Sequence, residues 1–182
     1  MLAKMIVVVG GVAGSGKTTV GAVLAERLHW PFQDADAFHP AANIAKMRSG
    51  VPLTDADRAP WLAGIAAWLD ERIAGGESAV AGCSALKRSY RDQLLAGRPS
   101  AWLAFLEISR ELAHARLAAR HGHFFSVQLL ESQFAELEPP RDEPRVLVLE
   151  ATRSPDELAD EIIERLRLAA GPAAAARRPE GQ

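Results

Sequence analysis

Residues 6–18 read Ile-Val-Val-Val-Gly-Gly-Val-Ala-Gly-Ser-Gly-Lys-Thr and lead into a stretch with helical periodicity. The apolar run at 6–9 is typical of a buried strand, and residues 11–18 match the pattern G-x-x-x-x-G-K-[ST]. In the order strand, glycine-rich loop, helix, this pattern predicts a phosphate-binding loop. Its glycines permit a tight turn, and its backbone N–H groups and the helix N-terminus attract anions.

The side chains of this loop have their own predicted roles. Lys17 is expected to reach the β- and γ-phosphates of a nucleoside triphosphate, and the Thr18 hydroxyl is expected to bind Mg²⁺. We therefore expect a nucleoside triphosphate and Mg²⁺ as ligands. The expected nucleotide contacts come from Gly11, Val12, Ala13, Gly14, Ser15, Gly16, Lys17, Thr18 and Thr19.

Strand and helix patterns alternate along the whole chain, which favours a single α/β domain with a parallel sheet covered by helices on both faces. Apolar runs predict five strands at 5–10, 31–34, 79–83, 102–108 and 145–150. Periodicity predicts helices at 17–29, 40–49, 57–74, 87–96, 110–120, 126–137 and 155–168. The expected domain spans residues 1–170, and residues 171–182 are expected to form a disordered tail.

Composition limits the partners. The 182 residues carry a formal net charge of −2, which excludes a broad basic surface for nucleic acid. No run of about 18 apolar residues predicts a membrane span. The single cysteine, Cys83, cannot form an intramolecular disulfide, and no signal-peptide pattern precedes the first strand, so we expect a cytoplasmic protein.

Ligands of parallel sheets bind beyond the carboxyl ends of the strands, which directs attention to Asp34, Asp36 and His39. Carboxylates one residue apart point to opposite sides of an extended chain, so they need not share a role. We expect Asp34 to lie near Mg²⁺ and Asp36 to orient or deprotonate a substrate hydroxyl. The alternative is an acidic surface pair at a helix start, and His39 either contacts substrate or caps the next helix.

Three basic residues suggest an anionic substrate. Arg58 lies in the first turn of a predicted helix, where the helix dipole disfavours a cation. Either an external anion or a salt bridge to Asp55 or Asp57 explains it. Lys87 and Arg91, four residues apart, predict one basic helical face that is either solvated or binds substrate. Ser84 is a candidate N-cap for the same helix.

A basic segment, Arg120-His121-Gly122-His123, links two predicted helices. Such a segment can fold over a bound nucleotide and exclude water, so we expect a lid at about residues 119–138. Arg116 lies four residues before Arg120 and is expected to join it at the nucleotide. A zinc site from the two histidines is a poor alternative, because no Cys or third nearby His completes it. The predicted metal ligands are Thr18 and Asp34, for Mg²⁺.

Together these segments resemble the gluconokinase family of P-loop sugar-acid kinases. The resemblance spans about residues 5–168, and its most specific parts are Phe38-His39-Pro40, Cys83-Ser84-Ala85-Leu86-Lys87 and Gly122-His123-Phe124-Phe125. Further matching stretches lie at 10–17, 34–37, 43–53, 57–62 and 90–92. Ala35 departs from the glycine often found in the family, and Arg48 adds a charge at a variable position.

The resemblance implies a nucleoside-monophosphate-kinase-like fold and ATP-dependent phosphorylation of D-gluconate at its 6-hydroxyl. The implied catalytic residues are Lys17, Asp36 and Arg120, with Arg116 and Arg120 at the nucleotide. The implied substrate contacts are Asp36, His39, Arg58, Lys87, Arg91 and His123. The family is often homodimeric, but nothing in this sequence establishes a dimer.

Other functions fit parts of the sequence. Shikimate and nucleoside-monophosphate kinases share the loop and the fold, but a shikimate kinase is expected to carry a glycine pair after the third strand. This chain has Gly82-Cys83-Ser84-Ala85 there. An ATP-dependent binding module is a further alternative. A GTPase is excluded, because Asn43, the single asparagine, is followed by Ile44 and no Asn-Lys-x-Asp motif exists.

Overall fold

A computed structural model describes residues 4–119 and 127–170 of the chain. They form one α/β domain around a parallel sheet with strand order β2-β3-β1-β4-β5. The strands are β1 (Ile6–Gly10), β2 (Phe32–Asp34), β3 (Ala79–Gly82), β4 (Ala101–Glu107) and β5 (Val146–Glu150). The predicted tail and residues 120–126 lie outside the described part of the chain.

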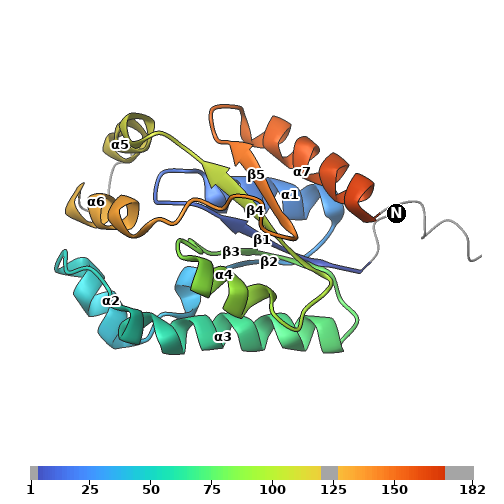
Figure 1. The fold of residues 1–182 in the computed structure, drawn as a ribbon, viewed down its shortest axis with the longest axis horizontal. Helices are drawn as coiled ribbons and strands as arrows, with labels where there is room; N and C mark the ends of the chain where they lie inside the picture. The colour runs from blue at the N-terminus through green and yellow to red at the C-terminus, as the bar shows by residue number, and fades with distance from the viewer. Residues whose placement is uncertain (1–3, 120–126, 171–182) are drawn as a thin grey trace, which may run out of the picture.

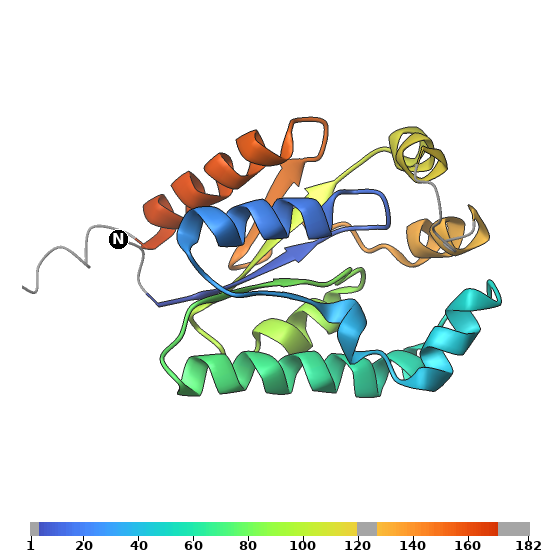
Figure 2. The ribbon, with the colours of Figure 1, turned by 180° about the vertical axis from the view of Figure 1, so that it is seen from behind.

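Helices cover both faces of the sheet. They are α1 (Lys17–Leu28), α2 (Ala41–Arg48), α3 (Asp55–Ala74), α4 (Arg88–Leu95), α5 (Arg110–Ala118), α6 (Val127–Glu136) and α7 (Pro155–Ala170), with a short 3₁₀ helix η1 (Ala35–Phe38). Helices α1 and α7 lie on one face, and α3 and α4 lie on the other (Figures 1 and 2). Helices α2, α5 and α6 stand together at one end of the molecule (Figure 2). None of the described helices is long and apolar enough to cross a membrane.

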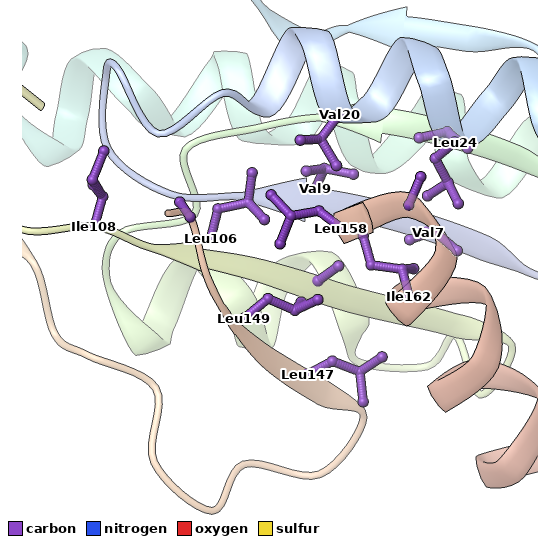
Figure 3. Close-up of a cluster of buried hydrophobic side chains, with 14 of the residues drawn as sticks. Val7, Val9, Val20, Leu24, Leu106, Ile108, Leu147, Leu149, Leu158 and Ile162 are labelled. Atoms are coloured by element: carbon purple, nitrogen blue, oxygen red, sulfur yellow. The ribbon is translucent and has the colours of Figure 1, made fainter. Parts of the chain in front are cut away.

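The central strand β1 is buried on both faces, which explains why its sequence is a continuous apolar run rather than an alternating one. Val7 and Val9 pack with α1 and α7 in one core (Figure 3), whereas Ile6 and Val8 pack against α3 and α4 in the other. Because successive side chains of a strand point to opposite faces, a strand covered on both faces must be apolar throughout. The two cores fix β1, and with it the start of the phosphate-binding loop.

The structure confirms the predicted strands and helices, with ends displaced by one or two residues at most of them. The placement of a helix start by Ser84 is wrong: α4 begins at Arg88, and Lys87 is its N-cap residue. The Ser84 carbonyl instead accepts a hydrogen bond from the Gly11 N–H, which joins this loop to the end of β1. Helix α3 begins at Asp55, because Thr54 caps it.

Candidate active site

The phosphate-binding loop runs from β1 into α1 through backbone conformations that favour glycine. Gly14 and Gly16 have φ angles of 80° and 99°, in the left-handed region. At Gly14 a Cβ atom would also lie 2.9 Å from the Ala113 carbonyl oxygen, which is too close for a side chain. The loop therefore requires glycine for its turn and for its close approach to α5.

A cavity of about 210 Å³ opens beside this loop, at the carboxyl ends of the strands where ligands of such sheets bind. Both predicted halves of the site contribute to it. The sequence-predicted residues that line it are Ala13, Gly14, Gly16, Lys17, Thr18, Asp34, Asp36, His39 and Arg58. The structure thus brings the phosphate-binding loop and the candidate acceptor-binding residues to one cavity.

Thr18 and Asp34 form the polar corner of the cavity nearest the start of α1. The Thr18 hydroxyl donates to Asp34 Oδ2 at 2.8 Å, and Asp34 Oδ1 accepts the Asp36 N–H at 3.0 Å. In the described part of the chain no group of three His, Cys, Asp or Glu side chains could hold a metal ion. Mg²⁺ fits the two oxygens nonetheless, because it commonly uses one or two protein ligands together with waters and substrate phosphates.

His39 stands on the acceptor side of the cavity, stacked on the Trp61 indole. The ring centroids are 4.5 Å apart with 7° between the planes. Burial first, and then the charge of Arg58, lowers the pKa of His39 to about 4, so the imidazole is neutral near pH 7. Its Nε2 lies 4.0 Å from Asp36 Oδ1, and the Asp36 side chain is 87% exposed. The pair offers a neutral ring and an accessible carboxylate to a ligand.

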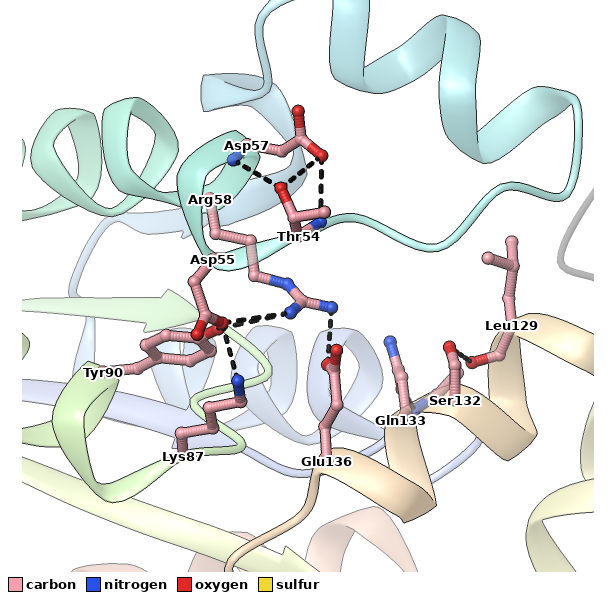
Figure 4. A network of polar contacts seen from close by, with 11 residues as sticks. Thr54, Asp55, Asp57, Arg58, Lys87, Tyr90, Leu129, Ser132, Gln133 and Glu136 are labelled. Carbon is pink, nitrogen blue, oxygen red and sulfur yellow. Dashed lines mark hydrogen bonds and ion pairs between the residues drawn. The ribbon is translucent and has the colours of Figure 1, made fainter.

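Arg58 is the buried cation of the site and lies in a network of polar side chains (Figure 4). Its Nη1 donates to the Tyr90 hydroxyl at 3.2 Å, and its Nη2 lies 2.7 Å from Glu136 Oε2 on α6. The predicted salt bridge to Asp55 is long, at 3.9 Å. Asp55 instead accepts hydrogen bonds from Lys87, at 2.6 Å, and from Tyr90. Arg58 thus pairs with Glu136, a partner that no sequence pattern indicates.

Lys87 and Arg91 do not form one basic face, because Lys87 precedes α4 and Arg91 points inward. Neither lines the cavity. The buried Arg91 guanidinium pairs with Glu143 at 2.6 and 2.8 Å and donates to the Ala85 and Leu86 carbonyls at 3.1 and 2.8 Å. This geometry contradicts the expectation that Arg91 contacts substrate. Arg91 instead holds Glu143 and the Ala85 and Leu86 carbonyls in the protein interior. Lys87 contacts Asp55 and lies over the Tyr90 ring, with its Nζ 5.6 Å from the ring centroid.

Arg116 lies under the phosphate-binding loop rather than in the cavity. Its guanidinium donates to the Gly14 and Ser15 carbonyls, each at 3.4 Å, and to the Ala151 carbonyl at 2.6 Å. It therefore ties the loop to the end of β5. The two other predicted lid residues, Arg120 and His123, lie outside the described residues.

Sequence reasoning missed the contribution of α6. Leu129, Ser132 and Gln133 line the cavity, and Gln133 Oε1 accepts the Ala13 N–H at 2.7 Å. With Glu136 they recur at i, i+3, i+4 and i+7, which places them on one helical face. The spacing of these residues is visible in the sequence. It does not show that this face of the helix lies against the cavity. Asn43, which is buried beside His39, was also given no role in the predicted site.

Comparison with known proteins identifies the family. The shikimate kinase family model matches residues 13–167. A gluconokinase from Gluconobacter oxydans is 48% identical over 162 residues, covering 89% of this chain and 91% of that protein. The crystal structure of a gluconokinase from Sinorhizobium meliloti 1021 has a TM-score of 0.86 and 39% identity, covering 98% of this chain and 100% of that one.

A shikimate kinase from Aquifex aeolicus shares the fold alone, with a TM-score of 0.56 and 16% identity. The fold is common to both of these solved structures, so the higher identity to gluconokinases carries the distinction. This chain belongs to the gluconokinase family, within the broader group of P-loop kinases that the shikimate kinase model describes.

Proposed function

We propose that this protein transfers the γ-phosphoryl group of ATP to the 6-hydroxyl of D-gluconate, releasing ADP and 6-phospho-D-gluconate. Membership of the gluconokinase family supports the reaction. The single observation that carries the proposal for the site is its cavity, which joins the phosphate-binding loop to Asp36, His39 and Arg58. A kinase needs both halves within one space, because phosphoryl transfer depends mainly on positioning and charge neutralisation.

On the nucleotide side, the phosphate-binding loop and the first turn of α1 hold the phosphates of ATP, and Lys17 balances their negative charge. Lys17 lines the cavity, where its Nζ lies 2.9 Å from the Val12 carbonyl oxygen. Arg116 supports the loop from behind through the Gly14 and Ser15 carbonyls. From the family motif, we assign Arg120 to the nucleotide and His123 to the substrate.

Thr18 and Asp34 would hold Mg²⁺, since their oxygens are already hydrogen-bonded to each other at the cavity wall. When bound, the ion would supply positive charge that neutralises the phosphate oxygens. Asp34 also holds the backbone of Asp36, because it accepts the Asp36 N–H. The same side chain thus sets the metal corner and the position of the neighbouring carboxylate.

On the acceptor side, Asp36 accepts a hydrogen bond from the 6-hydroxyl and turns its oxygen toward the γ-phosphorus. A bond forms from this oxygen to phosphorus as the bond to the β–γ bridging oxygen breaks, and the hydroxyl proton passes to Asp36. Neutral His39 contacts the hydroxyl-bearing chain. Arg58 receives the carboxylate at the far end, because a guanidinium binds a carboxylate through charge-assisted hydrogen bonds. Lys87 supports Arg58 through Asp55.

The proposal is tested by ADP release in the presence of ATP and Mg²⁺ with D-gluconate, shikimate, AMP or no acceptor. Turnover with gluconate alone is expected, with the phosphate at C6 in the NMR spectrum of the product. Turnover without an acceptor would indicate an ATP-dependent binding module. Turnover only with shikimate or AMP would replace gluconate by that substrate.

A further inference from the structure

Glu136 is the last residue of α6 and contacts Arg58. Arg58 is the cation to which the proposed function assigns the carboxylate of the acceptor. Glu136 Oε2 lies 2.7 Å from Nη2 of Arg58, and the two side chains are 25% and 9% exposed (Figure 4). Glu136 Oε2 is buried and faces the Arg58 guanidinium as an ion pair. The Glu136 carboxylate is therefore a charged partner of Arg58 in the absence of an acceptor.

The charges around Arg58 are balanced before any acceptor enters. Arg58 and Lys87 supply two cations, and Asp55 and Glu136 supply two carboxylates. Tyr90 joins them, accepting from Arg58 and donating to Asp55. A further carboxylate brought to Arg58 would leave this partly buried cluster with a net negative charge.

The energetic consequence is large on the scale of substrate binding. Two like charges held close together in a partly buried site repel each other, because the surrounding protein screens them less than bulk water does. Arg58 also has few open positions for a second carboxylate. Its Nη1 is bonded to Tyr90 and its Nη2 faces Glu136. An acceptor carboxylate and Glu136 therefore compete for the same cation.

We propose that Glu136 occupies the position on Arg58 that the carboxylate of the acceptor takes, so that the acceptor binds by displacing it. This inference rests on the proposed function, because it takes Arg58 as the carboxylate-binding group. Glu136 then sets selectivity: an acceptor with a carboxylate can replace it on Arg58, whereas a neutral polyol cannot. The same competition weakens the binding of gluconate itself.

The test compares the KM of D-gluconate with the inhibition constant of D-glucitol, which carries CH₂OH in place of the carboxylate. In Glu136→Gln, the gluconate KM should fall about three- to tenfold, because a like charge next to the binding position is removed. The glucitol constant should stay within about twofold, since glucitol has no charge to be repelled.

Glu131→Gln is the matched control. Glu131 lies on the same helix but pairs with Arg110 and with His114 of α5, so this substitution should leave both constants unchanged. Glu136→Asp is the second variant. It keeps the charge but is one methylene shorter, so it should hold Arg58 less well and lower the gluconate KM without changing the glucitol constant.

The outcomes separate the two proposals. An unchanged or raised gluconate KM in both variants at Glu136 would overturn the displacement, and it would show that Glu136 orients Arg58 instead. A parallel change for gluconate and glucitol would also overturn it, because a merely structural effect acts on both ligands. Absence of gluconate turnover by the wild-type protein would refute the proposed function itself.

Discussion

The side-chain amide of Asn43 lies 3.4 Å from Nδ1 of His39 and donates to the Asp57 carbonyl at 2.8 Å. A backbone carbonyl only accepts, so the contact with Asp57 fixes which end of the amide is nitrogen. The same NH₂ group faces His39, and Nδ1 must therefore be the unprotonated nitrogen of the neutral ring. The proton lies on Nε2, on the side of Asp36.

This relationship predicts the tautomer of His39. Nitrogen-15 NMR of histidine-labelled protein should show His39 with its proton on Nε2 at pH 7, and His39→Gln assigns the signal. In Asn43→Asp, a carboxylate that accepts should draw the proton to Nδ1 and lower kcat/KM for gluconate by about tenfold. A wild-type His39 protonated on Nδ1 would contradict the prediction, as would an unchanged tautomer in Asn43→Asp.

The buried His39 also predicts how stability depends on pH. Its pKa falls from 6.5 to about 4 because of burial and the nearby Arg58, so between these values the unfolded chain binds a proton that the folded chain does not. The free energy of unfolding should therefore decrease as pH falls from about 7 to 5. Urea unfolding at several pH values should show that the free energy of unfolding of His39→Gln decreases less between pH 7 and 5 than that of the wild type. His29→Asn, at an exposed histidine, should keep the wild-type slope, and equal slopes for all three would refute the prediction.

The contact between Thr18 and Asp34 predicts a metal dependence. Asp34→Asn removes the charge of an expected Mg²⁺ ligand, so the Mg²⁺ concentration for half-maximal activity should rise by about tenfold or more. Activity is measured against Mg²⁺ at a fixed, saturating ATP concentration. Asp70→Asn is the control, because Asp70 pairs with Arg98 away from the cavity. Equal Mg²⁺ requirements in both variants would exclude Asp34 from the metal site.

Arg58 predicts a selective loss of acceptor binding. Removing a charge-assisted hydrogen bond costs about 1.5–3 kcal/mol, so Arg58→Ala should raise the gluconate KM by roughly 10- to 100-fold. The KM for ATP should stay within about twofold. The gluconate KM of Arg58→Lys should lie between those of the wild type and Arg58→Ala, since an ammonium keeps the charge but lacks the planar fork of a guanidinium.

The double variant Arg58→Ala with Glu136→Gln provides the control for Arg58. It avoids leaving the Glu136 carboxylate in the site without the cation that it faces. If the double variant binds gluconate as the wild type does, Arg58 is not the group that receives the carboxylate.

Arg91 predicts a change in stability rather than in substrate binding. Arg91→Ala leaves Glu143 buried and unpaired, so the free energy of unfolding should fall by about 3–5 kcal/mol while the gluconate KM remains unchanged. Arg91 holds the pKa of Glu143 below its usual value, and this stabilisation should disappear as pH falls below about 4.5.

Arg88→Ala is the matched control on the same helix. Arg88 is 63% exposed and its contact with Asp92 is long, at 3.9 Å, so the loss should stay below about 0.5 kcal/mol. If Arg91→Ala raised the gluconate KM and left the free energy of unfolding at its wild-type value, Arg91 would belong to the substrate-binding site.

Much of the fold was predictable because local chemistry specifies it. The run at 6–9 requires burial on both faces, the glycines at 14 and 16 require left-handed backbone, and Lys17-Thr18 follows at a fixed spacing. The order of strands and helices then brings Asp34 and Asp36 to the same sheet edge as this loop. The sequence by itself therefore determined the fold class, the phosphate-binding half of the site and the family resemblance.

Only the tertiary structure decided which charges meet. Lys87 and Arg91 lie four residues apart, yet Lys87 pairs with exposed Asp55 and Arg91 is buried against Glu143. Arg58 and Glu136 are distant in the chain and lie on different helices, and their 2.7 Å contact follows from how α6 packs across the cavity from α3. Ion pairing depends on distance and burial, which sequence spacing specifies only within one helix or strand.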